Sequence, residues 1–322
     1  MNIKFGVHIE PQLGYTFEQA LAIALEAEKI GYESFWCSDH LFLNENSVNQ
    51  NCLEAWTLLS ALAATTSKIR LGTMVTCNSY RHPSLLAKIA ASIDMISNGR
   101  LWFGYGAGWK KDEYRAYGYD FPKIQVRMDM MEEALQIINL LWTESRPSFK
   151  GKHYSIEDAF SAPKPIQKPH PPILIGGDGE KRTLKAVVKY ADYCNLFLRP
   201  DFERKLDVLG NHCRDVGRDY DDVGKSLFAQ GWPGVFVTKD EDVLHDHWKK
   251  RAEILNRPVD EVAEYARANA PGAWVGYPED LIERFEYFIG LGFDLFQVMF
   301  MGLDEDYINS TRAFYDWVIK KL

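Results

Sequence analysis

His40 follows a predicted strand, a position from which a side chain could act as an acid–base catalyst. Asp39 and His40 come directly after residues 34–38, a short apolar stretch that predicts a buried strand. An imidazole titrates near neutral pH, so a histidine at the end of a strand is well placed to carry a proton. The same side chain could instead only hydrogen-bond a loop, and the spacing leaves both interpretations open.

Two glycine-rich turns suggest a second kind of chemistry. Residues 104–109 (GYGAGW) and 176–179 (GGDG) each follow an apolar stretch and lead into a helical pattern. Glycine lets backbone amides approach a phosphate closely, and the N-terminus of a following helix favours negative charge. The alternative is a pair of tight turns that need glycine for conformational reasons, but the two turns together favour a ligand that carries a phosphate. Trp109, at the end of the first turn, could wall a binding pocket.

Metal and thiol chemistry have less support in the sequence. His8 and His40 would give a metal ion two ligands, but the later strands are not followed by an HxH or DxD set, so no metal is expected. Cys77 has no sequence neighbour that would activate its thiol, which favours a small residue lining a pocket. None of the five cysteines forms a CxxC pair, so we expect reduced thiols rather than disulfides.

The elements that would position these residues alternate regularly along the chain. About eight apolar stretches of strand length are each followed by a helical pattern, with no linker between them. This alternation predicts a parallel sheet, and eight units in 322 residues favour a closed (β/α)8 barrel over an open, doubly wound sheet. The open sheet would be expected to show a GxGxxG fingerprint between Gly6 and Gly14, and that pattern is absent. We therefore expect one barrel domain over residues 1–322.

The predicted strands cover residues 3–9, 34–38, 69–75, 101–105, 173–175, 193–197, 227–237 and 295–300. The predicted helices cover residues 16–30, 55–66, 84–96, 124–142, 180–190, 202–216, 241–255, 259–269, 278–291 and 307–319. Six prolines and a Lys-Gly-Lys turn interrupt the pattern between residues 145 and 172, which predicts an inserted hairpin and an extended crossing. Since the active site of a barrel lies at the C-terminal ends of its strands, the residues directly after each strand are the site candidates.

Composition and charge exclude several classes of partner. The chain has 37 basic and 45 acidic side chains and a net charge of −8, so it has no general attraction for nucleic acid or an anionic membrane. No apolar run approaches the roughly 20 residues that span a bilayer, and the first residues form a strand pattern rather than a targeting peptide. We expect a cytoplasmic protein that acts on a small-molecule substrate.

Five segments together resemble the bacterial luciferase-like monooxygenase superfamily. They cover nearly the whole chain in the family's order, and as a set they are specific for it. The segments are residues 31–40 (GYESFWCSDH), 71–75 (LGTMV), 104–114 (GYGAGWKKDEY), 169–177 (PHPPILIGG) and 276–280 (GYPED). The resemblance implies a (β/α)8 TIM barrel with an insertion, a homodimer, and a flavin-type cofactor at the C-terminal mouth of the barrel. The apolar helices predicted over residues 55–66 and 84–96 are candidates for the dimer surface.

The sequence looks most like the branch of this superfamily that uses the deazaflavin coenzyme F420. In that branch the residue matching Asp39 contacts the cofactor, and the one matching His40 donates or accepts a proton. The resemblance also implies a non-prolyl cis peptide at or beside Met74–Val75, behind the cofactor ring. The further cofactor contacts that it implies are Cys77, Gly106, Ala107, Gly108, Asp112, Gly176 and Gly177.

Two positions depart from the F420-dependent glucose-6-phosphate dehydrogenases. Those enzymes have a glutamate where this chain has Trp109 and a tryptophan where it has Asn44, which argues against a sugar-phosphate substrate. Trp109 is expected to shape the substrate pocket. Glu10 is either a second carboxylate of that pocket, beside His40, or a solvated turn residue.

The sequence therefore predicts hydride transfer between coenzyme F420 and a small alcohol, enone or imine, with His40 as the acid–base residue. The nearest alternative is an FMN-dependent monooxygenase on the same barrel, since both cofactors share a ring shape and a phosphate. More distant alternatives are a flavin-binding protein without catalysis and a metal-dependent barrel hydrolase.

Overall fold

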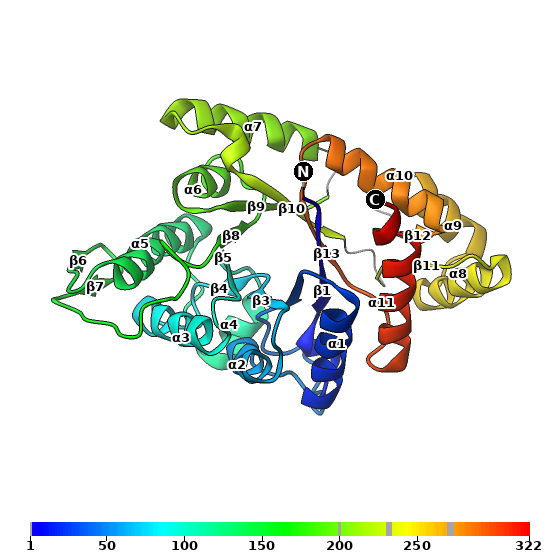
Figure 1. Ribbon diagram of the computed structural model, residues 1–322, viewed down its shortest axis with the longest axis horizontal. Helices are drawn as coiled ribbons and strands as arrows, with labels where there is room; N and C mark the ends of the chain where they lie inside the picture. Colours follow the sequence, from blue (N-terminus) through cyan, green and yellow to red (C-terminus); the bar gives the residue numbers. More distant parts are fainter. Residues whose placement is uncertain (1, 199–200, 230–233, 269–273) are drawn as a thin grey trace.

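The structure is a computed structural model that describes residues 2–198, 201–229, 234–268 and 274–322. Figure 1 shows strands in the middle of the molecule with helices arranged around them. In the described part of the chain, no helix is both long enough and apolar enough to cross a membrane.

The central strands form a closed, parallel barrel, as predicted. They pair in the order β3-β2-β1-β13-β10-β9-β8-β5, and β3 also pairs with β5, which closes the sheet. The short strand β4 pairs with β5 beyond the end of β3, so β3 and β4 share one of the eight positions. The strands are β1 (Lys4–Ile9), β2 (Ser34–Cys37), β3 (Arg70–Thr73), β4 (Thr76–Cys77), β5 (Leu101–Gly106), β8 (Ile173–Gly176), β9 (Tyr193–Leu196), β10 (Gly224–Ala229) and β13 (Leu295–Val298).

Helices cover the outside of the barrel, and their ends follow local signals in the sequence. For example, Thr16 and Gln19 form a capping box at the start of α1, and Gly31 ends that helix in the left-handed conformation, with φ 107°. The helices are α1 (Phe17–Ile30), α2 (Ala55–Thr65), α3 (Pro83–Ile96), α4 (Lys111–Tyr117), α5 (Ile124–Thr143), α6 (Thr183–Tyr190), α7 (Phe202–Val216), α8 (Glu241–Leu255), α9 (Val259–Ala268), α10 (Pro278–Gly290) and α11 (Glu305–Trp317).

Two predicted boundaries are wrong for identifiable reasons. The strand predicted over residues 227–237 is two strands: β10 belongs to the barrel, whereas β11 (Phe236–Val237) pairs outside it with β12 (Val275–Gly276). The chain passes through the left-handed region at Gly234, where φ is 128°, and residues 230–233 lie outside the described part. Helix α6 starts three residues later than predicted because residues 180–182 form a turn. The predicted end of α9, Asn269, also lies outside the described residues.

The predicted hairpin between α5 and β8 is present. Strand β6 (Phe149–Lys150) pairs antiparallel with β7 (Ser155–Ile156). Glu133 of α5 holds the connecting turn, because its carboxylate accepts hydrogen bonds from the amides of residues 152–154 at 2.8–2.9 Å. This hairpin and the extended crossing after it lie outside the strand positions of the barrel (Figure 1).

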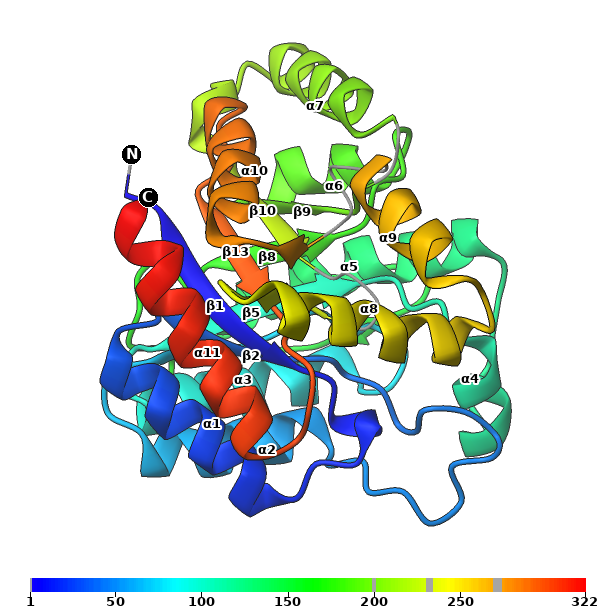
Figure 2. The same cartoon turned by 90° about the vertical axis from the view of Figure 1, so that its right-hand side faces the viewer.

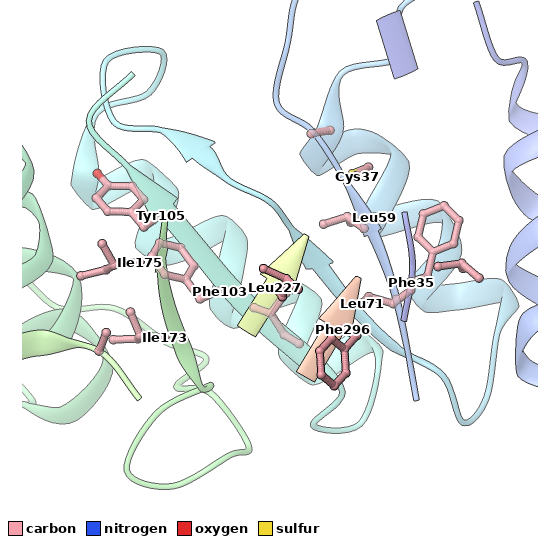
Figure 3. Packing of buried hydrophobic residues seen from close by; sticks show 14 of the residues in the cluster. Phe35, Cys37, Leu59, Leu71, Phe103, Tyr105, Ile173, Ile175, Leu227 and Phe296 are labelled. Atoms are coloured by element: carbon pink, nitrogen blue, oxygen red, sulfur yellow. The ribbon is translucent and has the colours of Figure 1, made fainter. Parts of the chain in front are cut away.

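Apolar side chains fill two layers on either side of the barrel wall. Between strands and helices lie Phe35, Leu71, Phe103, Ile175 and Phe296 (Figure 3). The residues that alternate with these point inward, and they form a second cluster of Trp36, Met74, Trp102, Leu174 and Leu295. The predicted packing roles of Trp36, Trp102 and Trp142 are confirmed, since all three are at most 3% exposed.

Helices α8 and α9 pack on each other (Figure 2) and have a smaller apolar cluster of their own. That cluster consists of Leu244, Trp248, Ala252, Val262, Ala263 and Val275.

Candidate active site at the C-terminal mouth of the barrel

The predicted site residues lie at the C-terminal ends of the barrel strands. Glu10 follows β1, Asp39 and His40 follow β2, and Met74–Val75 separates β3 from β4. Residues 107–109 follow β5, and Gly177 follows β8. Parallel strands of a closed barrel end at one rim, so residues that are distant in sequence meet there.

His40 is held by a carboxylate that the sequence did not identify. Its Nδ1 lies 3.1 and 3.2 Å from the two carboxylate oxygens of Glu113, in the first turn of α4. The Glu113 side chain is fully buried, whereas that of His40 is 19% exposed. A carboxylate on one ring nitrogen fixes the orientation of an imidazole and leaves the other, here Nε2, for a ligand.

Glu113 also ties the loop after β2 to α4. Its oxygens accept a hydrogen bond from the Leu41 amide at 2.7 Å and one from the Tyr80 hydroxyl at 2.5 Å, and the Lys110 ammonium lies 3.2 Å away. Burial acts to raise the pKa of Glu113, but His40, the Tyr80 hydroxyl and the Leu41 amide outweigh it and lower the pKa to about 2. Glu113 is therefore an anion at neutral pH.

Asp39 connects the end of β2 to the segment after β3. Its two oxygens accept hydrogen bonds from both terminal nitrogens of Arg81, each at 2.8 Å, and one oxygen also accepts from the Cys77 amide at 2.9 Å. Burial raises the pKa of Asp39, while the Arg81 guanidinium and the Cys77 amide act in the opposite direction. Arg81 bridges to a second carboxylate, Glu54. These contacts fix the backbone around Cys77, and the implied contact of Asp39 with a cofactor stays a prediction.

Glu10 belongs to a hydrogen-bonded network and does not lie on a solvated turn. Nε2 of the buried His8 lies 3.2 Å from one of its oxygens, and the Gln12 amide donates to the other. Burial acts to raise the pKa of Glu10, but the hydrogen bond from His8 and the charges of His8 and His40 lower it below its usual value. Glu10 and His40 thus share one electrostatic environment. The described residues contain no group of three or more His, Cys, Asp or Glu side chains placed to hold a metal ion.

The peptide bond between Met74 and Val75 is cis, at the position that the family resemblance implied. The Val75 side chain packs against glycines of the neighbouring strands. A Cβ at Gly106 would come within 2.7 Å of this side chain, and one at Gly176 within 3.0 Å. Two of the predicted cofactor glycines are therefore needed to make room for Val75.

The other two predicted cofactor glycines, Gly108 and Gly177, are needed for the backbone conformation of the turns, the alternative to phosphate binding that the sequence left open. Gly108 and Gly177 have φ values of 77° and 125°, in the left-handed region that favours glycine. A Cβ at Gly108 would also meet the Tyr114 hydroxyl at 2.1 Å. The Gly177 amide donates to the Asn195 carbonyl at 3.1 Å, so this amide already has a partner.

The remaining predicted contacts differ in exposure. Cys77 is buried, its sulfur lies 3.2 Å from the Tyr114 hydroxyl, and burial raises the pKa of its thiol to about 11. The thiol is therefore protonated, which agrees with a lining residue rather than a nucleophile. Ala107 is half-buried at the mouth, and Asp112 is exposed in the first turn of α4.

Trp109 stands beside His40 with most of its surface uncovered. The two rings are nearly perpendicular, at 87°, with centroids 5.6 Å apart, and Trp109 is 70% exposed. A large exposed indole next to a titratable group is a natural wall for an apolar ligand.

Sequence reasoning missed Glu113, Tyr80, Arg81 and Lys110. Glu113 carried a usable signal, since it stands four residues after Trp109 in the first turn of a predicted helix. The other three gave none. Tyr80 and Arg81 contact segments far apart in the chain, and Lys110 joins its near neighbour Glu113 to distant carbonyls at residues 42 and 43.

Comparisons with known proteins identify a family for this chain. Residues 2–295 match the family model described as luciferase-like monooxygenase. An F420-dependent glucose-6-phosphate dehydrogenase from Microbacterium testaceum is 27% identical over 326 residues, which cover 94% of this chain and 93% of that protein. The pyrimidine monooxygenase RutA of Pseudomonas savastanoi pv. phaseolicola is 32% identical over 188 residues, or 57% of this chain and 51% of RutA. This second match thus spans only about half of the relative's length.

Solved structures share the fold over the whole chain. The monooxygenase RslO1 from Streptomyces bottropensis superposes with a TM-score of 0.81 at 22% identity, covering 99% of both chains. An F420-dependent secondary alcohol dehydrogenase in complex with an F420–acetone adduct gives a TM-score of 0.78 at 22% identity, again covering 99% of both. At this identity the likeness establishes the barrel alone.

Proposed function

The chain belongs to the luciferase-like monooxygenase family, and from that premise we propose that it is an F420-dependent oxidoreductase that exchanges a hydride with a small organic substrate. The observation that carries the proposal is the pair of His40 and the buried, ionised Glu113 at the barrel mouth. Such a pair suits the movement of a proton to or from a substrate oxygen or nitrogen. The F420-dependent relative that matches over nearly the full chain supports the choice of cofactor.

The residues at the mouth fit a flat ring. The Val75 side chain lies against three glycines, Gly104, Gly106 and Gly176, at positions where a larger residue would collide with it or with the backbone. A Cβ at Gly104, for example, would come within 1.8 Å of the Thr73 carbonyl oxygen. This part of the rim is therefore backbone and one aliphatic side chain, against which a planar ring system can pack closely. We propose Met74, Val75, Cys77 and the two glycine-rich turns as its contacts, with Asp39 bracing the segment that carries Cys77.

When bound, F420 supplies a ring carbon that gives or accepts a hydride. His40 then gives a proton at Nε2 when a carbonyl is reduced, and takes it when an alcohol is oxidised. Glu113 holds Nδ1, fixes the ring orientation and stabilises the protonated imidazole. Because the pKa of Glu113 is about 2, the carboxylate keeps its charge throughout.

An FMN-dependent monooxygenase is the second candidate. The family description and the pyrimidine monooxygenase relative favour it. The two candidates share the barrel and differ in the ring that binds, in the need for oxygen and in the role of His40.

Titration of the protein with F420 and with FMN, followed by absorbance and fluorescence, tests the proposal. We expect F420 to bind and FMN to bind at least ~10-fold more weakly. His40→Ala should keep F420 binding but lose turnover with alcohols, enones or imines, since it removes the proton carrier alone. Binding of FMN alone, with oxygen consumption, would establish the monooxygenase instead. Binding of neither would contradict a flavin-type site, and full turnover in His40→Ala would contradict the role of His40.

A further inference from the structure

Carboxylates outnumber permanent cations in the network around His40. The network consists of the side chains linked by ion pairs at the mouth, together with Glu10. This residue follows β1, which pairs with β2, and it is linked through the Gln12 side chain to Ser38, directly after β2. Its carboxylates are Glu10, Asp39, Glu54 and Glu113, and its permanent cations are Arg81 and Lys110. A ligand that approaches His40 therefore meets an excess of negative charge.

Both cations of this network are already satisfied. An ammonium has three protons to donate, and Lys110 has three acceptors: the carbonyls of Phe42 and Leu43 and the carboxylate of Glu113. The guanidinium of Arg81 lies between Asp39 and Glu54 and bonds to both. Both positive charges are therefore already paired with carboxylates of the network, and neither is left to neutralise a phosphate or a carboxylate of a substrate.

Glu10 is the carboxylate of the network that lacks a permanent cation. Within the described part of the chain its ion-pair partner is the imidazole of His8, and its other hydrogen bonds come from the neutral side chains of Gln12 and Ser38. Its side chain is 14% exposed. No permanent cation therefore neutralises its negative charge at the mouth, where this charge repels anions.

The same rim presents aromatic surface. Trp109, 70% exposed, stands over His40. The rings of Phe42 and Tyr117 stack with centroids 6.3 Å apart, and Tyr117 is 55% exposed. Exposed aromatic rings beside an acid–base residue favour a substrate with an apolar body, and Trp109 would also accept a cation on its face.

We infer that the substrate carries no negative charge and packs an apolar face against Trp109, and that Glu10 excludes phosphorylated and carboxylated compounds. This inference rests on the proposed oxidoreductase function and narrows its substrate to neutral or cationic alcohols, carbonyls and imines. It separates this site from that of the glucose-6-phosphate dehydrogenase relative, whose substrate is a phosphate ester.

A matched pair of probes tests the inference. Benzyl alcohol and 4-(hydroxymethyl)phenyl phosphate share a ring and a hydroxymethyl group and differ in charge. Calorimetric titration of the cofactor-loaded protein should give a Kd at least ~10-fold lower for benzyl alcohol. Glu10→Gln should reduce this ratio several-fold by improving binding of the phosphate, because it removes the repelling charge. Trp109→Ala should weaken benzyl alcohol binding by ~10-fold or more.

Glu157→Gln is the matched control, because it removes an exposed carboxylate just after β7 and should leave both Kd values unchanged. Equal or tighter binding of the phosphate would overturn the inference. If Arg251→Ala or Arg284→Ala then abolished that binding, these half-buried arginines, which form no ion pair in the described residues, would mark an anion site instead. Failure of benzyl alcohol to bind would contradict the packing of an apolar substrate against Trp109. Since these titrations need no hydride transfer, failure of the proposed reaction is detected separately.

Discussion

His40 and Glu113 meet although 73 positions separate them in the chain. The sequence could predict His40, because a histidine directly after a strand belongs at the mouth of a barrel. Glu113 carried one signal, its place in the helical pattern after Trp109, but its contact with His40 was not predictable because it depends on how α4 leaves the turn at Gly108. Asp39 illustrates the same limit: its position was predictable, but its pairing with Arg81 was not.

Glu113→Gln tests whether this carboxylate positions His40. The amide keeps the shape of the side chain but loses the charge that orients and stabilises the imidazole. We expect kcat to fall at least ~10-fold while KM and the Kd of the cofactor stay within ~2-fold. Glu113→Asp, which restores the charge, should recover part of the loss.

Arg115→Gln is the control for this variant, since it changes an exposed side chain on the same helix. Steady-state kinetics and a cofactor titration on the wild type and the three variants test whether Glu113 positions His40. A kcat for Glu113→Gln equal to that of the wild type would rule out a positioning role.

Strand and helix periodicity predicted most elements because each barrel unit is a local pattern with its own start and stop signals. The predictions failed where a tertiary contact or a bend decided the outcome. The strand predicted over residues 227–237 is two strands, β10 in the barrel and β11 outside it, and β11 pairs with β12, which lies about 40 positions further along the chain. Helix α4 was expected only as a helical pattern after the first glycine turn, yet it supplies the carboxylate of the site.

The attachment of α4 should depend on pH through Glu113. The pKa of this side chain is about 2 in the folded protein against 4.5 ordinarily, so its ionised form stabilises the fold. That contribution is fully present above pH 4.5 and is lost as the pH falls toward 2. The shift corresponds to at most about 3 kcal/mol of unfolding free energy.

Urea unfolding of the wild type and of Glu113→Gln measures this effect as a difference, which cancels the titration of the other carboxylates. The wild type should be more stable by about 1–3 kcal/mol at pH 6.5, and the gap should shrink by more than half at about pH 3.0. Glu157→Gln should show no comparable gap at either pH. A gap that stays constant with pH would show that Glu113 titrates normally in the folded state.

The closed barrel is what turns scattered residues into one site. Positions 10, 40, 75, 109 and 177 lie on five segments, and only closure of the sheet through the β3–β5 pair brings all of them to one rim. Once the barrel was inferred, the sequence therefore predicted that the residues directly after each strand meet at the mouth, but it missed the residues that other segments bring there. It could not predict which charges are neutralised there. The pairing of Lys110 and Arg81 with carboxylates forms only in the folded molecule, because most of these contacts join distant segments of the chain.

Assembly of two copies is the last expectation from the family resemblance, and the outer surface of α3 is where we expect it. This helix exposes Leu85, Met95 and Ile96 at 49–56% each, which makes an apolar face on a helix that the sequence already proposed for the dimer surface.

Light scattering after gel filtration should give a mass of twice 37.0 kDa. Leu85→Glu should convert the dimer to a monomer, because it places a charge inside the contact. Leu25→Glu, at a 42% exposed leucine of α1, is the matched control and should stay dimeric. A monomeric wild type would contradict the dimer, and a dimer that persists in Leu85→Glu would move the contact away from α3.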